Sequence, residues 1–249
     1  MLFVRHASTP GMRAARFPAP DEEADAASLA RATALTQPLS GPLSGAAAGA
    51  TGGPVVGAAT EAVLGPVAGP MVGPMAGAAV GPVRGPVAGA VGGAVGDVAG
   101  GAVGGLVVSA GPSVAARQTV AALRLAARVV PALAEVDCGR WRGLPYERVA
   151  REEPDALAGW LTDPHATPHG GESLAAHAGR VAAWLESVRA DPGVVAVCDA
   201  GTIRAALGHA LGLDPLSAAR FDLAPLSVTE LTVTRAGWRV AHVNRKVLM

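Results

Sequence analysis

The residues best suited to chemistry lie near the start of the chain. Arg5, His6, Ser8 and Thr9 directly follow the apolar run Met1–Val4. Such a run predicts a short buried strand, and open α/β sheets carry their chemistry just beyond the carboxyl ends of their strands. A neutral imidazole is a good nucleophile near neutral pH, and a guanidinium offers a planar fork of donors to a tetrahedral anion. These residue types therefore suit an anionic substrate.

Three later segments place carboxyl groups at predicted element ends. Glu135 lies in the sequence Leu-Ala-Glu-Val-Asp-Cys-Gly-Arg-Trp-Arg-Gly, and Glu172 lies in the turn Gly-Gly-Glu-Ser. Asp199 follows the apolar residues 194–197, which we expect to form a central strand because they are apolar on both faces. In this order, the four motifs resemble the histidine phosphatase superfamily, also called phosphoglycerate-mutase-like.

The resemblance covers residues 1–36 and 106–249, and it implies a single domain with a three-layer α/β/α sandwich. The small phosphatase branch, which includes α-ribazole-phosphatase-like members, is the most similar. Such proteins hydrolyse small organic phosphates without a metal or other cofactor. A small phosphorylated metabolite is therefore the expected partner, and the sequence does not indicate an oligomeric state.

The resemblance also implies roles for individual residues. His6 would attack phosphorus and become a phosphohistidine, while Arg5 would hold the phosphate oxygens. Thr9 would add a hydroxyl, and Arg16 falls where the family often has another basic residue. Glu135 aligns with the general acid, since a carboxyl group beside a phosphate has its charged form disfavoured.

Some of these residues also have a purely structural interpretation. His6 could simply cap a strand end, and Glu135 could be a solvated loop carboxylate. Glu172 aligns with a residue at the rim that serves structure and substrate contact, although Gly-Gly-Glu-Ser is also a common sequence before a helix.

Two positions depart from the family pattern. Ala115 stands where the second phosphate-binding arginine should be, and Arg117 lies two positions further, about 200° around a helix, so it should face away. Asp199 stands where the family has its second histidine, and an ionised carboxylate repels a phosphoryl group instead of donating to it.

Other histidines offer limited compensation. His169 precedes the Gly-Gly-Glu-Ser turn and is a candidate to project into the pocket. His177 and His209 lie within predicted helices, and we expect them on helix surfaces. His165 and His169 are four apart, but Pro164 and Pro168 interrupt a helix there, which argues against a zinc site.

Two function classes follow, and the sequence leaves them nearly even. The first is a metal-independent phosphomonoesterase that uses His6 and Glu135, with activity weakened by Ala115 and Asp199, because each lost donor typically reduces the rate about 10²–10³-fold. The second is a catalytically impaired relative that binds a ligand or partner protein. A third, weaker possibility is that Asp199 suits a substrate less charged than a phosphate monoester.

Composition limits the partners and the compartment. The chain has 20 basic and 20 acidic residues, so its formal net charge gives no electrostatic reason to expect nucleic acid or an anionic membrane. Cys138 and Cys198 have no redox or metal-ligand spacing. Because Arg5 interrupts the first apolar run, no secretory signal is predicted, and a cytoplasmic protein is expected.

A tetrapeptide repeat separates the two parts of the domain. Glycine recurs at every fourth position from Gly41 to Gly93, except at Glu61, and is often followed by proline. The prolines exclude a continuous helix, and the segment has no aromatic residue to pack, so we expect residues 37–105 to be a disordered insertion. A membrane helix around 89–108 is the less favoured alternative, because Gly and Ala gain little on transfer to lipid.

The rest of the sequence alternates between strand and helix patterns, as a parallel sheet requires. We expect strands at 2–4, 106–108, 194–197, 227–233 and 238–244, an extended piece near 132–135, and helices at 21–35, 113–128, 146–153, 154–161, 173–190 and 202–211.

Overall fold

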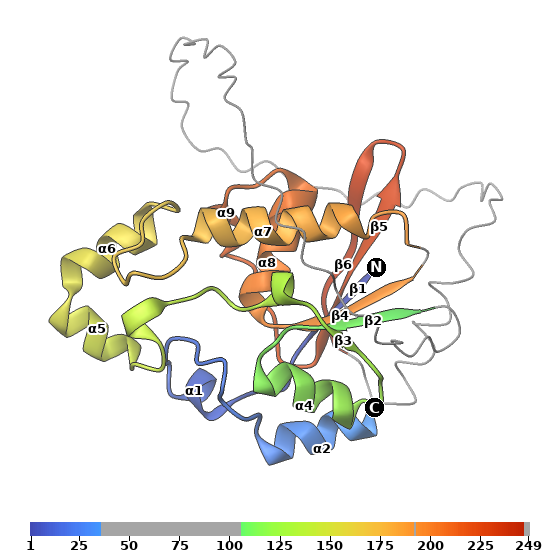
Figure 1. Ribbon diagram of the computed structural model, residues 1–249, viewed down its shortest axis with the longest axis horizontal. Helices are drawn as coiled ribbons and strands as arrows, with labels where there is room; N and C mark the ends of the chain where they lie inside the picture. The colour runs from blue at the N-terminus through green and yellow to red at the C-terminus, as the bar shows by residue number, and fades with distance from the viewer. Residues whose placement is uncertain (36–105, 192, 247–249) are drawn as a thin grey trace, which may run out of the picture. The chain divides into compact units, whose positions relative to one another are not determined.

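A computed structural model describes residues 1–35, 106–191 and 193–246 (Figure 1). The glycine-rich repeat lies outside these residues. The prediction of disorder for 37–105 therefore falls outside the described residues, as does most of the alternative membrane helix around 89–108. The described residues belong to one compact unit of the chain.

Six strands form one mixed sheet in the order β3-β2-β4-β1-β5-β6. They are β1 (Leu2–Arg5), β2 (Val107–Ala110), β3 (Arg128–Val129), β4 (Val194–Cys198), β5 (Ser227–Thr234) and β6 (Gly237–Lys246). The first four are mutually parallel, and β5 and β6 are antiparallel to their neighbours. The alternating pattern predicted the parallel strands, but the direction of the last two strands was not predicted. The tight turn at 235–236 makes those two strands antiparallel.

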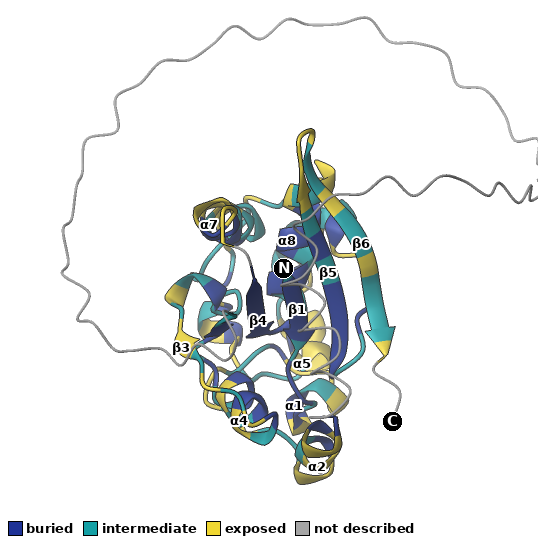
Figure 2. Cartoon of the chain, turned by 90° about the vertical axis from the view of Figure 1, so that its right-hand side faces the viewer, coloured by how far each residue is buried: buried dark blue, intermediate teal, exposed yellow. Residues whose placement is uncertain are grey.

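Helices cover both faces of the sheet, which confirms the three-layer sandwich (Figure 2). The α-helices are α1 (Pro10–Arg13), α2 (Ala26–Ala34), α4 (Val114–Ala122), α5 (Tyr146–Glu152), α6 (Pro154–Thr162), α7 (Leu174–Ser187), α8 (Ala200–Leu211) and α9 (Pro215–Ala218). Two 3₁₀ helices, η1 (Pro131–Leu133) and η2 (Gly139–Trp141), lie between β3 and α5.

The alternation of side chains along β1 and β4 builds a core on each face. Val4 and Val197 pack with residues of α2 and α4, whereas Phe3 and Ala196 pack with residues of α7 and α8. Each buried large apolar side chain contributes about 1.5–3 kcal/mol relative to an exposed one. The prediction that residues 194–197 form a central strand is confirmed, since β4 lies between β2 and β1 and is buried throughout.

Two helices are shorter than their sequence patterns predict. The helix predicted at 113–128 ends at Ala122, because Arg124 adopts a positive φ of 53° and the chain then extends into β3. The helix predicted at 21–35 begins only at Ala26, after Asp25 in extended conformation. Beyond Ala122 the apolar residues continue although the backbone has left the helix, whereas residues 21–25 are mostly acidic.

A third apolar cluster supports the segment between η2 and α6. It is centred on Trp141, which is fully buried against Phe17, Val149 and Leu157. The Phe17 and Trp141 ring centroids lie 5.2 Å apart. This cluster holds α5 and α6 together, and Trp160 and Leu161 of α6 line the cavity described below.

Candidate active site

Neighbouring strands bring the predicted catalytic positions together. Arg5 pairs with Cys198 in the parallel register of β1 and β4, and the His6 amide donates to the Cys198 carbonyl at 2.9 Å. His6 and Asp199 therefore leave adjacent strands at the same edge of the sheet, the usual place for a site in an open α/β fold.

The His6 imidazole is held in one tautomer. Its Nδ1 lies 2.7 Å from the Ala7 carbonyl oxygen, and because a carbonyl only accepts, Nδ1 carries the proton. The other ring nitrogen, Nε2, lies 3.5 Å from Glu135 Oε1. In the neutral ring, Nε2 therefore presents a lone pair beside a carboxyl group, as a nucleophile adjacent to an acid requires.

Burial governs the protonation of this pair. His6 is 3% exposed, and burial alone would lower its pKa, but the hydrogen bond and the charge of Glu135 together raise the pKa of His6 above its ordinary value. Burial raises the pKa of Glu135, with the hydrogen bond to His6 opposing that shift. The pKa values of both groups are thus raised, and the hydrogen bond between them links their protonation.

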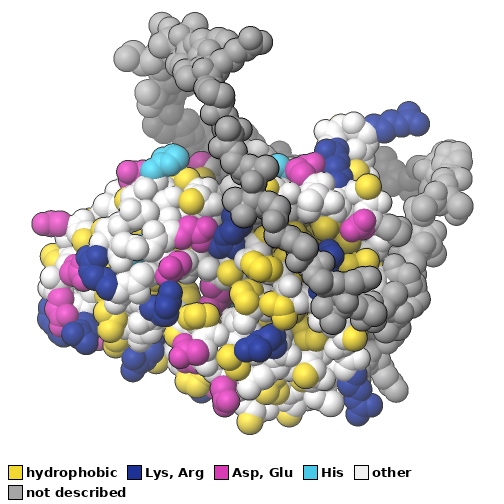
Figure 3. All heavy atoms as spheres, viewed as in Figure 1, with side chains coloured by type: hydrophobic (Ala, Val, Ile, Leu, Met, Phe, Trp, Pro, Cys, Tyr) yellow, Lys and Arg dark blue, Asp and Glu magenta, His cyan; other side chains and the backbone are white. Residues whose placement is uncertain are grey.

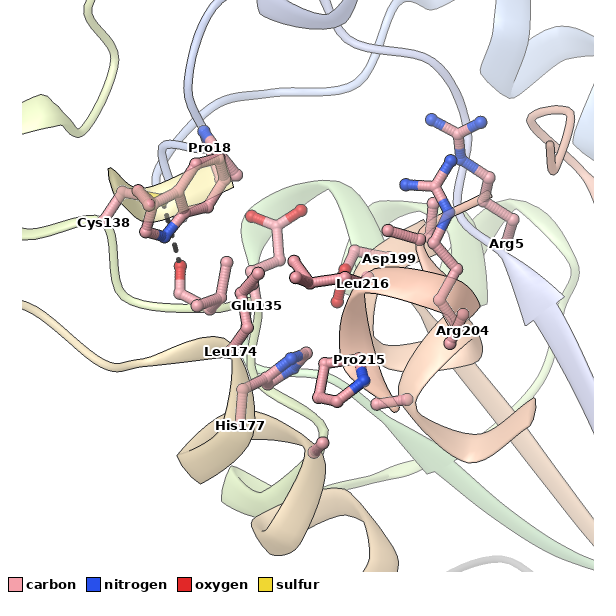
Figure 4. Close-up of a pocket in the computed structure, with 18 of the residues that line it drawn as sticks. Arg5, Pro18, Glu135, Cys138, Leu174, His177, Asp199, Arg204, Pro215 and Leu216 are labelled. Carbon is pink, nitrogen blue, oxygen red and sulfur yellow. Dashed lines mark hydrogen bonds between the residues drawn. The ribbon is translucent and has the colours of Figure 1, made fainter. Parts of the chain in front are cut away.

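Two guanidinium groups lie side by side at one end of the site (Figure 4). Arg5 donates to the Leu223 carbonyl, and Arg204 Nε donates to the Phe221 carbonyl at 2.8 Å. Burial lowers the pKa of Arg5, and the positive charge of Arg204 adds to that effect. Among the described residues, neither forms an ion pair with a carboxylate. Two guanidinium groups without a direct carboxylate contact suit a bound anion.

These groups line one cavity of about 480 Å³. Its polar end holds Arg5, His6, Glu135, Asp199 and Arg204. The remaining walls are largely apolar and include Trp160, Leu161, Leu174, Pro215 and Leu216. A cavity with a few convergent polar groups and apolar walls is the usual form of a small-molecule site.

Ala115 faces the same site, as the resemblance implies. With His6, Thr9 and Glu135 it lines a smaller hollow of about 70 Å³. Arg117 is exposed and lines neither cavity, in agreement with its expected position on the other side of α4. The missing cation is therefore not replaced from within α4.

The Asp199 carboxylate is committed to the start of α8. Its Oδ1 accepts from the Thr202 amide at 3.0 Å, and its Oδ2 accepts from the Thr202 hydroxyl at 2.5 Å. Asp199 thus caps α8 while its side chain lines the cavity. It therefore presents only acceptor oxygens to this part of the cavity.

The structure distributes the other predicted residues unevenly. Thr9 caps α1 by accepting from the Met12 amide at 3.3 Å, and it borders only the smaller hollow. Arg16 lines both cavities and donates to the Gly143 carbonyl at 3.0 Å. Glu172, expected at the rim for substrate contact, does not line the main cavity, because both its oxygens accept from Arg180.

Two expectations about histidines are corrected. His169 does not project into the cavity, because its ring packs on Trp141 with centroids 5.0 Å apart and its Nδ1 accepts from the Gly171 amide. His177, expected on a helix surface, is only 3% exposed and lines the cavity. The buried side of α7 includes His177 because the helix begins at Leu174, beside the site.

Sequence reasoning missed Arg204 and His177 as site residues. Arg204 follows Asp199 by five positions, and the helix that starts at Ala200 turns it back toward Arg5. Its only signal in the sequence was its position at the end of the segment that follows Asp199. His177 gave no signal, because the facing of α7 depends on tertiary packing.

Comparison with known proteins identifies the family. A model of the histidine phosphatase superfamily (branch 1) matches residues 95–246, more than half of the chain. The chain belongs to the histidine phosphatase superfamily. The matched residues include Glu135, His177, Asp199 and Arg204, whereas Arg5 and His6 precede them.

Individual relatives are more distant. Phosphoserine phosphatase 1 from Hydrogenobacter thermophilus is 37% identical over 84 residues, which span 32% of this chain and 40% of that protein. The chain thus matches less than half of that relative's length. A mycobacterial glucosyl-3-phosphoglycerate phosphatase solved with VO3 has a TM-score of 0.64 at 21% identity, covering 99% of this chain and 98% of that one. A putative α-ribazole-5'-P phosphatase from Escherichia coli has a TM-score of 0.66 at 13% identity, covering 100% and 98%. At these identities, the two structures support the fold.

Three further features were sought in the described residues: a metal cluster, a membrane-spanning helix and a charged surface patch. Within 1–35, 106–191 and 193–246, no three His, Cys, Asp or Glu residues gather as metal ligands. No helix in the same ranges is long and apolar enough to cross a membrane. On the face shown in Figure 3, basic and acidic side chains of the described residues are interspersed instead of gathered by sign.

Proposed function

We propose that this member of the histidine phosphatase superfamily hydrolyses a small phosphate monoester through a phosphohistidine on His6. The observation that carries the proposal is the fixed tautomer of His6, with Nε2 3.5 Å from Glu135 in a cavity that also holds the guanidiniums of Arg5 and Arg204. Family membership supports the reaction class, and the phosphatases among the relatives support a small phosphorylated substrate.

In the first step, the Nε2 lone pair of His6 attacks phosphorus and the bond from phosphorus to the ester oxygen breaks. The leaving oxygen takes the proton of Glu135, whose pKa is raised by burial. Arg5, with Arg204 beside it, offsets the charge on the phosphoryl oxygens. The products of this step are the free alcohol and a phosphohistidine.

In the second step, Glu135 accepts a proton from water as the water oxygen attacks phosphorus. The phosphorus–nitrogen bond then breaks, which releases inorganic phosphate and restores neutral His6 and protonated Glu135. The first step therefore needs a proton on Glu135 and none on His6 Nε2, and the second step needs Glu135 without its proton. The pKa of Glu135, which burial raises, supports its role as the acid of the first step.

The test is phosphate release from a broad panel of monoesters by the full chain, by His6→Ala and by His242→Gln. His242 is a half-exposed histidine on β6 that lies outside the cavity. We expect turnover that His6→Ala abolishes and His242→Gln keeps, together with a phosphoryl group trapped on His6 in an alkaline quench.

Absence of His6-dependent turnover on the whole panel would overturn the proposal. Binding of inorganic phosphate without turnover would then favour the second function class, a ligand-binding relative, for which Ala115 and Asp199 are the motivating observations.

A further inference from the structure

His177 enters the cavity from a different element than the other polar groups. It lies in the first turn of α7, is 3% exposed, and shares the cavity with His6, Glu135 and Asp199. In Figure 4 its ring is directed from α7 toward the space beside Glu135 and Asp199. A titratable ring so deeply buried in the wall of a site normally needs polar partners.

A hydrogen-bonded chain links this ring to the position that lacks a histidine. The Thr202 hydroxyl lies 2.5 Å from Asp199 Oδ2 and 3.4 Å from His177 Nε2. Thr202 has one hydroxyl proton, and the shorter contact to the carboxylate takes it. The Thr202 oxygen is then left to accept from His177 Nε2, so the imidazole is oriented through Asp199.

Gly201 keeps the space between these groups open. A Cβ added there would lie 2.9 Å from Asp199 Oδ1 and 3.7 Å from His177 Cε1. The first distance is shorter than a normal contact, so a side chain at this position would displace Asp199 or the ring. The absence of a side chain therefore preserves the arrangement of Asp199 and His177 at the cavity wall.

Phosphoryl transfer through His6 requires donors for the charge that builds on the phosphoryl oxygens. Ala115 offers none, and Asp199 offers only acceptor oxygens, both engaged by Thr202. We propose that His177 supplies the second imidazole of this site, as a donor to the phosphoryl oxygens that Asp199 cannot provide. This inference rests on the proposed phosphatase function and deepens it: the imidazole comes from α7 instead of from the end of β4.

The charges around His177 predict how it responds to a ligand. Burial lowers the pKa of His177, and Arg180 adds to that shift. The charges of Asp199 and Glu172 and a hydrogen bond to the Ala134 backbone oppose it, while Glu135 and His6 face the ring across the cavity. The empty site therefore favours a neutral ring. A bound phosphate dianion adds negative charge nearby, which favours the imidazolium and its second N–H donor.

The first test follows the His177 ring by NMR while inorganic phosphate is added, with His177→Val used to assign its signal. We expect saturating phosphate to move the titration midpoint of His177 to higher pH. The half-exposed His242 should not move. An unchanged His177 midpoint in a protein that binds phosphate would overturn the inference.

The second test moves the imidazole. His177→Val should reduce kcat by about 10²–10³-fold, with the fold verified by circular dichroism. His177→Val combined with Asp199→His should recover most of that loss, because the ring returns to the position that the family uses. Unchanged kcat in His177→Val would overturn the inference.

The two tests also separate this inference from the proposed function. If the wild-type protein shows no His6-dependent turnover, the phosphatase proposal fails, yet the phosphate-dependent titration still decides whether His177 belongs to the anion site. If turnover depends on His6 but is insensitive to His177→Val, only the present inference fails.

Discussion

Glu135→Gln isolates the role of the proposed acid. Glutamine has nearly the same shape and still lies beside His6, but its amide cannot release a proton. Glu135 Oε1 lies 3.5 Å from His6 Nε2, and the Glu135 side chain is only 17% exposed. The substitution should therefore leave the cavity intact while it removes proton transfer to the leaving oxygen.

The size of the effect depends on the leaving group. General acid catalysis contributes about 10²–10⁴-fold, which corresponds to roughly 3–5 kcal/mol of the barrier. An alkyl phosphate needs the whole contribution, because an alkoxide is a poor leaving group. A nitrophenyl phosphate needs little of it, because nitrophenolate leaves without a proton. We expect the alkyl ester to lose about 10²–10⁴-fold in kcat/KM and the nitrophenyl ester less than tenfold.

The pH profile of the Glu135→Gln variant independently tests the effect of Glu135 on the pKa of His6. The wild-type acid limb reflects protonation of His6, whose pKa is raised chiefly because Glu135 outweighs the effect of burial. Without that carboxyl group, burial is opposed only by the Ala7 hydrogen bond and the charge of Asp199, which are smaller effects, so the pKa of His6 should fall. His6 then stays neutral to lower pH, and the acid limb should move to lower pH.

The assay is kcat/KM for both esters from pH 4 to 9, with Glu186→Gln as a matched control. Glu186 pairs with His209 and Trp238 outside the cavity. An equal loss on both esters, or an acid limb that does not move, would refute an acid role for Glu135 and leave it only a structural one.

Three further substitutions test other parts of the site. Ala115→Arg adds a cation beside His6, and we expect phosphatase activity to rise by about 10²-fold. The larger side chain crowds the hollow of about 70 Å³, which should lower the free energy of unfolding by roughly 1–3 kcal/mol. A folded variant with unchanged activity would contradict the placement of position 115. Arg204→Met should weaken the binding of inorganic phosphate at least about tenfold, since it removes one charge-assisted donor worth roughly 1.5–3 kcal/mol. Isothermal titration calorimetry measures this affinity, and an unaltered value would show that Arg204 only donates to the Phe221 carbonyl. Trp141→Ala should lower the free energy of unfolding by about 3–5 kcal/mol, because the side chain is fully buried; a loss below about 1 kcal/mol in urea denaturation would contradict the central place of Trp141 in its cluster.

The sequence predicted the architecture well where local pattern and burial agree. The apolar run at 194–197 indicated a central strand, and β4 is one. The end of α4 was not predictable, because the positive φ at Arg124 leaves no mark in the apolar spacing. The antiparallel pairing of β5 and β6 would have required recognition of the short turn at 235–236.

In the candidate site too, local sequence pattern predicted some residues and not others. Residues that follow strands, such as His6 and Asp199, were found because strand ends meet at one edge of a sheet. His177 was missed, because only packing of α7 against α8 determines which of its faces is buried. Glu172 was expected to contact substrate, but the nearby Arg180 engages its carboxylate.

The position of β1 in the sheet has a consequence for assembly. Both neighbours of this strand, β4 and β5, lie about 190 or more positions further along the chain, as the pairs Leu2 with Val195 and Leu2 with Glu230 show. Pairing over such separations is entropically slow. We therefore expect His6, the proposed nucleophile, to acquire its surroundings among the last events of folding.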